Sequence, residues 1–384
     1  MTLGQAPRIV GSKLPHRKTS RSSKPIATFK VNQSKKNWAP RSGSIVVGDR
    51  LILTPCVWFG TGPDDSPRIW EHLIGPNVIA SAVELGRAFL DGGDTPLRAE
   101  RWMEIKQQAP LLMDSGGFRF LSDAEFRLSP QQVMRGYKAI QPDFGVVLDF
   151  PLEPSHSDWA NHRRWIRTLR NTKWMLRNDG VVNLVPVLHG YTGEELMAAC
   201  EEVASLAQPA MVGLGSIVPL LKRGLLRKSL QDEWGSVQAY IRFAIRTLRE
   251  WFPKSAVHVF GVGSVATMRQ VISAGADSMD SSSWRMKAAH GAIIVPGGYD
   301  RFVTPGPGRA GIGGFDQTQL RTCHCPVCRG RGPSAQLSQL DNAKGRTFAN
   351  RAIHNAWVLS MEVETIRGLL QYGALKHSHY GSFD

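Results

Sequence analysis

The sequence contains no apolar stretch close to the roughly 20 consecutive residues that a membrane-spanning helix requires. Its beginning also lacks the apolar core of a secretion signal, so we expect neither a membrane span nor a cleaved leader. Cysteine is scarce, with five residues in a chain of 384, and we find no short internal repeat. What remains is a hydrophobic content of 42%, which is enough for one large domain with a small one attached.

Acidic residues are missing from the first 48 positions, which hold ten of the 47 lysines and arginines. Much of the net charge of +15 therefore lies in a Ser/Lys/Arg-rich segment that cannot bury enough apolar surface to fold alone. We expect residues 1–44 to form a basic, flexible arm. It is either a solvated leader or an arm that binds a polyanion with a steep dependence on salt.

Three of the five cysteines fall within residues 323–328 (CHCPVC), and His354 follows in a helix-like segment. Three thiolates and one imidazole are a ligand set typical of structural Zn²⁺. A metal site is favoured over a disulfide because intracellular enzymes keep their thiols reduced. Four protein ligands leave no position for water, so the zinc is expected to stabilise the fold. The expected ligands are Cys323, Cys325, Cys328 and His354, with His324 as the alternative histidine.

From about residue 49 onward, short apolar runs alternate with amphipathic helix-like segments, which is typical of a parallel α/β sheet. One or two further strands, weakly marked, are expected near residues 45–55 and before residue 80. The pattern predicts a (β/α)8 TIM barrel over residues 45–315, followed by a zinc-binding subdomain and a C-terminal helix over residues 316–384. The clearest strands are Leu111–Asp114, Phe144–Phe150, Leu184–His189, Ala210–Gly215, Val257–Gly261 and Ala276–Asp280.

Carboxylates stand where three of these strands end, at Asp114, Asp149 and Asp280. In a barrel the carboxyl ends of the strands meet on one face, where active sites are built. Each aspartate alone could be a helix cap or a turn residue. Together they are suited to substitution at an anomeric carbon, where one carboxylate attacks and another transfers protons.

The motifs DSGGF (residues 114–118), VGLG (212–215), GVG (261–263) and DSMD (277–280), followed by the cysteine cluster, resemble those of the tRNA-guanine transglycosylases. The resemblance covers roughly residues 45–370. It implies a zinc-bearing TIM barrel that exchanges guanine in nucleic acid for a 7-deazaguanine base without breaking the backbone.

The resemblance also implies roles for individual residues. Asp280 would be the nucleophile that attacks C1′ and forms a covalent glycosyl-enzyme intermediate. Asp114 would transfer protons to and from the bases, and Asp149 would bind the edge of the base. The other substrate-binding candidates are Ser115, Gly116, Gly117, Phe118, His189, Gly213 and Leu214.

The chain departs from the family pattern in three segments: residues 188–190 (LHG), 216–219 (SIVP) and 281–287 (SSSWRMK). With the basic arm, these departures favour the DNA-modifying branch, the DpdA-type enzymes that insert bases such as preQ0 into DNA. They imply a cytoplasmic enzyme from a bacterium or phage, able to pair as a homodimer or to use helper proteins. Because a stacked guanine is inaccessible, the target nucleotide must be flipped or unpaired.

Candidates for holding the nucleic-acid strand combine basic residues with tryptophans, which can pair with phosphates and stack on bases. The same residues could instead form a solvated helix face that covers the barrel. They are Arg163, Arg164, Arg167, Arg170 and Lys173, with Trp159, Trp165 and Trp174 nearby, together with Arg285 and Lys287.

Three alternative interpretations of the sequence stay open. The first is a tRNA-guanine transglycosylase of the queuosine or archaeosine type, and the second is a catalytically inert zinc-bearing protein that binds nucleic acid. The third is a dinucleotide-binding fold, because residues 261–266 (GVGSVA) follow a strand and precede a helix.

Overall fold

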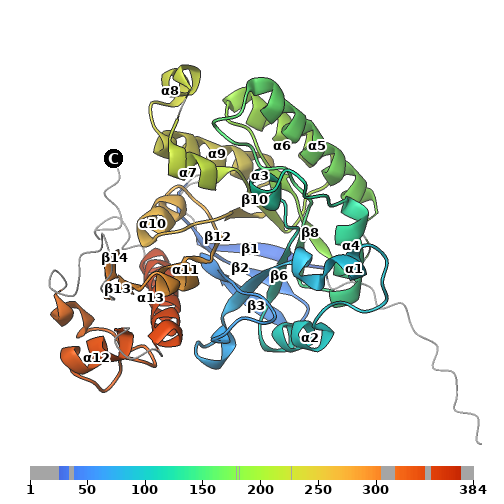
Figure 1. Cartoon of the computed structure of the whole chain (residues 1–384). Helices are drawn as coiled ribbons and strands as arrows, with labels where there is room; N and C mark the ends of the chain where they lie inside the picture. The colour runs from blue at the N-terminus through green and yellow to red at the C-terminus, as the bar shows by residue number, and fades with distance from the viewer. Residues whose placement is uncertain are drawn as a thin grey trace, which may run out of the picture.

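The computed structural model describes residues 26–33, 39–178, 180, 182–225, 227–303, 316–341 and 347–372. Within these ranges no helix is both long enough and apolar enough to cross a membrane. A ring of parallel strands stands at the centre of the molecule, surrounded by helices (Figure 1). The strands of this ring are β4 (Cys56–Gly60), β5 (Asn77–Ser81), β6 (Leu111–Asp114), β7 (Phe144–Val146), β8 (Asn183–Val185), β9 (Val187–Leu188), β10 (Met211–Leu214), β11 (Ala256–Val259) and β12 (Ser278–Ser281).

The ring closes through the short strands β8 and β9, which are one strand interrupted by Pro186. Proline has no N–H to donate to a neighbouring strand. Its carbonyl nevertheless accepts from the Gly213 amide of β10 at 2.9 Å, and the Val185 carbonyl accepts from the Val147 amide at 3.0 Å. Counting β8 and β9 together gives eight strands, so the predicted TIM barrel is confirmed and the open dinucleotide-binding sheet is excluded.

A second, three-stranded antiparallel sheet closes the end of the barrel from which the parallel strands start. It consists of β1 (Thr28–Gln33), β2 (Ser42–Val47) and β3 (Arg50–Thr54). Ile45 and Ile52 pack in one buried cluster with the barrel-interior residues Trp58 and Phe144. Residues 45–55, expected to supply a barrel strand, therefore form the β2–β3 hairpin that covers the barrel.

The basic arm expected over residues 1–44 overlaps this sheet. Strand β1 pairs with β2 along most of its length, so part of the expected arm is folded. The reason is that β1 is completed by a partner later in the chain, which local composition does not reveal. Residues 1–25 and 34–38 lie outside the described residues.

Several helices of the barrel, α4, α5, α6, α9 and α10, begin at a serine or threonine whose side chain caps the helix. Ser129 and Thr192 each form a capping box, with Gln132 and Glu195 respectively. The helices are α1 (Arg87–Leu90), α2 (Ala99–Gln108), α3 (Arg119–Ser122), α4 (Pro130–Ile140), α5 (Asp158–Arg177), α6 (Gly193–Leu206), α7 (Ile217–Arg223), α8 (Lys228–Trp234), α9 (Val237–Trp251), α10 (Val265–Ser273) and α11 (Ser283–Ala289).

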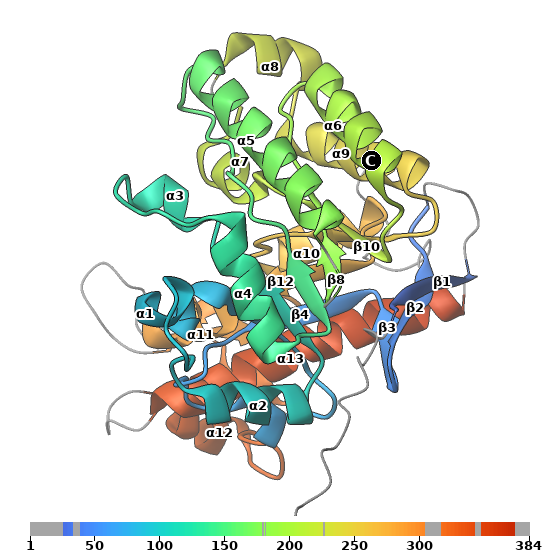
Figure 2. The ribbon, with the colours of Figure 1, turned by 90° about the vertical axis from the view of Figure 1, so that its right-hand side faces the viewer.

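The C-terminal part of the chain packs against the barrel. Helix α13 contacts barrel strand β4 as well as α11 and β13. The C-terminal part of the chain is therefore packed on the barrel wall through α13. In Figure 2, α3 and the β1–β3 sheet lie at opposite ends of the barrel, and the long helix α13 runs along its side. The elements of this part are β13 (Ala292–Val295), β14 (Tyr299–Phe302), α12 (Pro333–Leu340) and α13 (Thr347–Gln371).

Candidate active site

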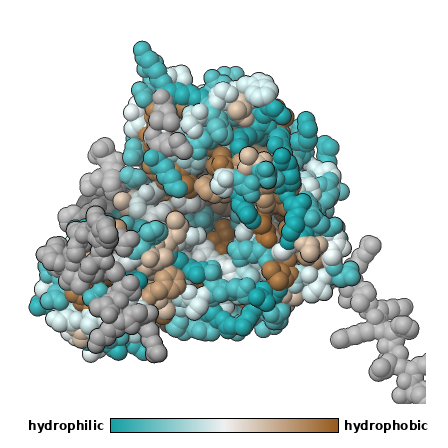
Figure 3. Space-filling model, in the orientation of Figure 1, coloured by the Kyte–Doolittle hydropathy of each residue, from teal (hydrophilic) through white to brown (hydrophobic). Residues whose placement is uncertain are grey.

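A cleft of about 1120 Å³ opens at the carboxyl ends of the barrel strands. Its lining includes Asp114 from β6, Asp149 after β7 and Asp280 from β12. The surface is hollowed here, with hydrophobic side chains exposed in its depth (Figure 3). The structure therefore brings the three strand-end carboxylates to one cavity.

Asp280 is held in place by one backbone amide and one imidazole. Its Oδ1 accepts from the Gly261 amide at 2.8 Å and lies 3.3 Å from His258 Nε2. His258 Nδ1 lies 2.8 Å from Ser278 Oγ, which also accepts from Trp58 Nε1 at 2.8 Å. The Ser278 hydroxyl can then donate to Nδ1, and this places the ring hydrogen on Nε2, facing Asp280. The carboxylate is fixed but retains an oxygen for chemistry.

Asp114 is set up as a proton carrier. Burial, and secondly the nearby charge of Asp149, raises the pKa of Asp114 to about 7, although the Gly116 amide donates to its Oδ2 at 2.9 Å. A carboxyl group with a pKa near neutrality can both give and accept a proton in one reaction cycle. Asp280 adds to the upward shift, which places both groups in one electrostatic environment.

Asp149 is positioned by a buried histidine behind it. His189 is 1% exposed, and its Nε2 lies 3.1 Å from Asp149 Oδ2. The other ring nitrogen, Nδ1, lies 2.7 Å from Ser216 Oγ, and Ser216 Oγ accepts from the Leu152 amide at 2.7 Å. His189, expected to contact the base, is not among the cleft-lining residues and lies behind Asp149 instead.

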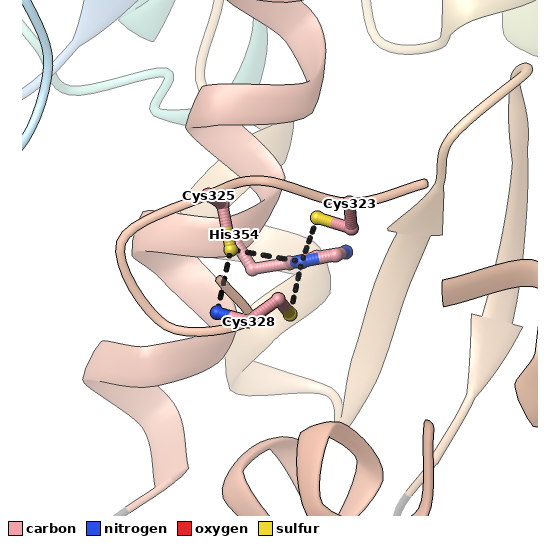
Figure 4. Close-up of side chains that lie close together, drawn as sticks. All are labelled: Cys323, Cys325, Cys328 and His354. Atoms are coloured by element: carbon pink, nitrogen blue, oxygen red, sulfur yellow. Dashed lines mark hydrogen bonds between the residues drawn. The ribbon is translucent and has the colours of Figure 1, made fainter. Parts of the chain in front are cut away.

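The four expected metal ligands come together in a buried cluster next to β13 (Figure 4). Each of the three Sγ atoms lies 3.5 Å from His354 Nδ1. A tetrahedral ion with bonds of ~2.3 Å to sulfur and ~2.0 Å to nitrogen would separate such atoms by about 3.5 Å. His354 Nε2 lies 2.9 Å from the Ile294 carbonyl, which fixes its hydrogen there and leaves the lone pair on Nδ1. The cluster therefore fits a metal ion such as Zn²⁺, with His354 rather than the exposed His324 completing the set.

The sequence matches the family model described as queuine tRNA-ribosyltransferase over residues 97–379. The chain belongs to this family. Among curated proteins the chain is similar to the tRNA-guanine(15) transglycosylase of Methanopyrus kandleri, with 24% identity over 69% of this chain and 52% of that protein. It is similar also to the tRNA-guanine(15) transglycosylase of Pyrococcus abyssi, with 24% identity over 90% of this chain and 55% of that protein. The chain spans about half the length of the curated relatives it matches.

The glycines of the family motifs make room for neighbouring side chains. A Cβ on Gly117 would lie 2.1 Å from Asp149 Oδ1, and a Cβ on Gly213 would lie 2.3 Å from the Phe260 ring. Gly116 has a φ of +88°, a conformation that glycine adopts at little cost. Gly117 and Gly213, two of the expected substrate-binding residues, therefore let Asp149 and Phe260 occupy their positions.

Not every predicted substrate-binding residue reaches the cleft. Phe118, 48% exposed, lines it, whereas Ser115 and Leu214 are fully buried. On the β10 side the lining residues are Gly215 and Ser216, which follow the expected pair Gly213 and Leu214. The cleft wall on the β10 side thus lies one or two residues beyond the expected pair, toward the end of the strand.

Two residues of the site, His258 and Phe260, are absent from the sequence prediction. His258 faces Ser278 because β11 and β12 pair in that register, and its ring packs 4.3 Å from that of Phe260. The sequence does contain a signal for these two residues. Side chains alternate along a strand, so His258 and Phe260 project to the same side of the strand that leads to the site. Gly261, considered as part of a dinucleotide motif, donates its amide to a carboxylate instead.

Proposed function

We propose that this protein exchanges guanine in a nucleic acid for a free 7-deazaguanine base through a covalent intermediate on Asp280. The observation that carries the proposal is the pair of unlike carboxylates in one cleft. Asp280 is oriented by an amide and an imidazole, and the pKa of Asp114 is raised to about 7. One group is prepared to attack and the other to transfer a proton.

In the first step, an oxygen of the Asp280 carboxylate forms a bond to C1′ of the target nucleotide. The glycosidic C1′–N bond breaks, and its electron pair leaves with guanine, which takes a proton from Asp114. In the second step, the incoming base loses a ring N–H proton to Asp114 while its nitrogen attacks C1′. The bond to Asp280 breaks, and both carboxyl groups return to their starting states.

The family match and the relatives' names favour tRNA as the nucleic acid. Both relatives described above are named tRNA-guanine(15) transglycosylases, and the family is named for a tRNA reaction. The expected preference for DNA receives no support from these comparisons. It rests on the three departing segments and the basic arm, and Arg285 and Lys287 of segment 281–287 line the cleft. DNA is therefore the second candidate substrate.

We propose further that the cysteine cluster binds a structural Zn²⁺ through Cys323, Cys325, Cys328 and His354. The ion would contribute no catalytic step and would tie the 323–328 loop to α13, which packs on β4. Metal analysis of the purified protein is expected to give one zinc per chain. Cys325→Ser is expected to lose the zinc and to unfold at a lower temperature. Full-strength binding of zinc by this variant would contradict the assignment.

The test of the function is incorporation of labelled guanine into tRNA and, separately, into DNA of matched length. Incorporation into tRNA alone supports the proposal, and incorporation into DNA alone supports the second candidate. A control variant is Glu201→Gln, which neutralises an exposed carboxylate on α6 outside the cleft. If the wild type binds nucleic acid but labels neither substrate, the inert binder is the better account.

A further inference from the structure

A second hollow, of about 700 Å³, lies beside the cleft. One wall is the segment after β6 that contains α3, from Phe120 to Arg127, and the opposite wall is the first half of α5. We call it the α3–α5 groove. No step of the proposed exchange reaction uses it.

The α3–α5 groove and the cleft share two stretches of chain. Asp149 and Pro151 line the cleft, and Phe150 between them lines the groove. Phe118 similarly lines the cleft, while Phe120 lines the groove. Because consecutive Cα atoms are about 3.8 Å apart, the two cavities adjoin within a residue or two. The groove is therefore within reach of a nucleotide next to one that occupies the cleft.

The floor of the groove is aromatic and rigid. The rings of Phe120 and Phe150 stack with centroids 4.3 Å apart, and Phe120 and Phe126 lie 4.9 Å apart. The Phe150 amide donates to Thr168 Oγ1 of α5 at 2.8 Å, which ties the floor to the wall. Phe150 is only 3% exposed, so this floor supports the groove, and the aromatic face that is open to a base is the exposed indole of Trp159.

The wall on α5 presents cations together with an exposed indole. Trp159, Arg163 and Arg167 repeat at intervals of four residues and so lie on one helix face. Trp159 is 67% exposed, the Arg163 guanidinium lies 4.6 Å from its ring centroid, and that of Arg167 lies 3.8 Å from the ring centroid of Phe150. Stacked guanidinium groups keep their N–H donors free for phosphate oxygens.

These cations are not neutralised by the protein. Among the described residues, no carboxylate forms an ion pair with Arg127, Arg163, Arg164 or Arg167. Asp123 also lines the groove, but its Oδ1 accepts from the backbone amides of Glu125 and Phe126, both at 3.0 Å. Burial, followed by the charges of neighbouring arginines, lowers the pKa of Arg167. An anion bound here would relieve the repulsion between these groups.

Arg164 has a different task from its neighbours. Its guanidinium donates to the Pro151 carbonyl at 3.1 Å and to the Phe120 carbonyl at 3.0 Å. It therefore connects the two walls and sets the width of the groove, which leaves Arg163 and Arg167 as the residues available to a ligand.

We propose that the α3–α5 groove binds the unpaired nucleotide next to the target, with its base on the exposed indole of Trp159 and its phosphates at Arg163 and Arg167. This inference rests on the nucleic-acid substrate of the proposed function. A single strand is favoured over an acidic protein segment because the groove combines free guanidinium groups with an exposed indole and lies beside the cleft.

The test measures binding of a fluorescent single-stranded RNA with one central guanine at several salt concentrations. All proteins carry Asp280→Ala, so that chemistry does not contribute. R163A/R167A is expected to bind at least tenfold more weakly, and its salt slope is expected to fall by about 1.4 for two lost phosphate contacts. W159A is expected to bind about five- to hundredfold more weakly with an unchanged slope. The matched control is K138A/R177A, which removes two exposed cations outside the groove.

A second measurement uses the protein with its native side chains. RNA with 5-iodouridine next to the guanine is expected to crosslink to Trp159 on irradiation. Groove variants that bind as tightly as the control, or a crosslink that avoids α5, would overturn the inference. Displacement of the labelled RNA by oligoglutamate, but not by unlabelled RNA, would also overturn the inference. Base exchange by the wild type is scored separately, so failure of the groove and failure of the transglycosylase proposal give different results.

Discussion

Two aspartates three residues apart, Asp277 directly before strand β12 and Asp280 within it, serve opposite ends of the barrel. Asp277 is fully buried, and its two carboxylate oxygens accept from the Arg41 guanidinium at 2.8 and 2.7 Å. Its Oδ2 also accepts from the Val257 amide at 2.9 Å. Asp280, at the other end, faces the cleft with a side chain that is 15% exposed, and among the described residues no lysine or arginine forms an ion pair with it.

Asp277 therefore contributes to stability, whereas Asp280, three residues later, is available for the proposed reaction. Arg41 precedes β2, so its ion pair with Asp277 attaches the three-stranded sheet to the barrel. The Arg249 guanidinium adds a bond to the Ala39 carbonyl at 2.7 Å. A carboxylate whose oxygens are all paired is a poor nucleophile, whereas one that is oriented but not neutralised remains nucleophilic.

The largest effect is expected for Asp280→Ala. We expect base exchange to fall by at least about 10⁴-fold because the covalent step is lost, while the free energy of unfolding changes by less than about 1 kcal/mol. A base-exchange assay and urea unfolding measure the two quantities. If a protein–RNA adduct can still be trapped under denaturing conditions with this variant, Asp280 is not the nucleophile.

For Asp277→Ala the pattern is expected to reverse. The variant leaves Arg41 buried without its partner and is expected to lose about 3–5 kcal/mol of unfolding free energy. Arg41→Met should cost a similar amount, and the double variant should recover part of the loss. Denaturant unfolding of the three proteins gives the coupling energy. Additive losses would show that the pair does not attach the sheet to the barrel.

Asp114→Asn tests the proton carrier through pH. The folded protein holds the Asp114 proton up to a pH of about 7, whereas the unfolded chain releases it near pH 4. Rising pH across this window therefore favours unfolding, and stability falls. The variant should lose less stability than the wild type between pH 5 and 8. Glu84, whose pKa burial also raises to about 7, contributes with the same sign in both proteins and cancels from the difference. Parallel stability curves would contradict the raised pKa.

The smallest effect is expected for the positioning residue His258. His258→Leu removes one hydrogen bond to a charged group, so kcat should fall by about ten- to hundredfold with KM little changed. His258→Gln retains an N–H donor and should restore part of the rate. A loss confined to KM would instead indicate that His258 contacts the substrate.

Much of this arrangement could be predicted from the sequence because local patterns determine it. Apolar runs that end in aspartate predicted the barrel and the face on which Asp114, Asp149 and Asp280 meet. The spacing of the three cysteines predicted a metal site, and the histidine that completes it lies on a helix, α13, as expected.

The rest depends on contacts between distant parts of the chain. The register of β11 against β12 determines that His258 lies behind Asp280, and no local pattern contains that register. The attachment of the β1–β3 sheet to the barrel depends on the contact between Arg41 and Asp277, which are 236 positions apart in the sequence. His189 lies at a strand end, as predicted, but the position of Ser216 directs its ring toward Asp149 and away from the cleft.

The most direct test of the account is base exchange measured on one preparation of the wild type, Asp280→Ala and Asp277→Ala at a temperature where all three are folded. We predict that labelled guanine enters tRNA with the wild type, not with Asp280→Ala, and at a readily measurable rate with Asp277→Ala. Equal labelling by the wild type and Asp280→Ala, or loss of labelling in folded Asp277→Ala alone, would contradict the assignment of chemistry to the cleft end of β12.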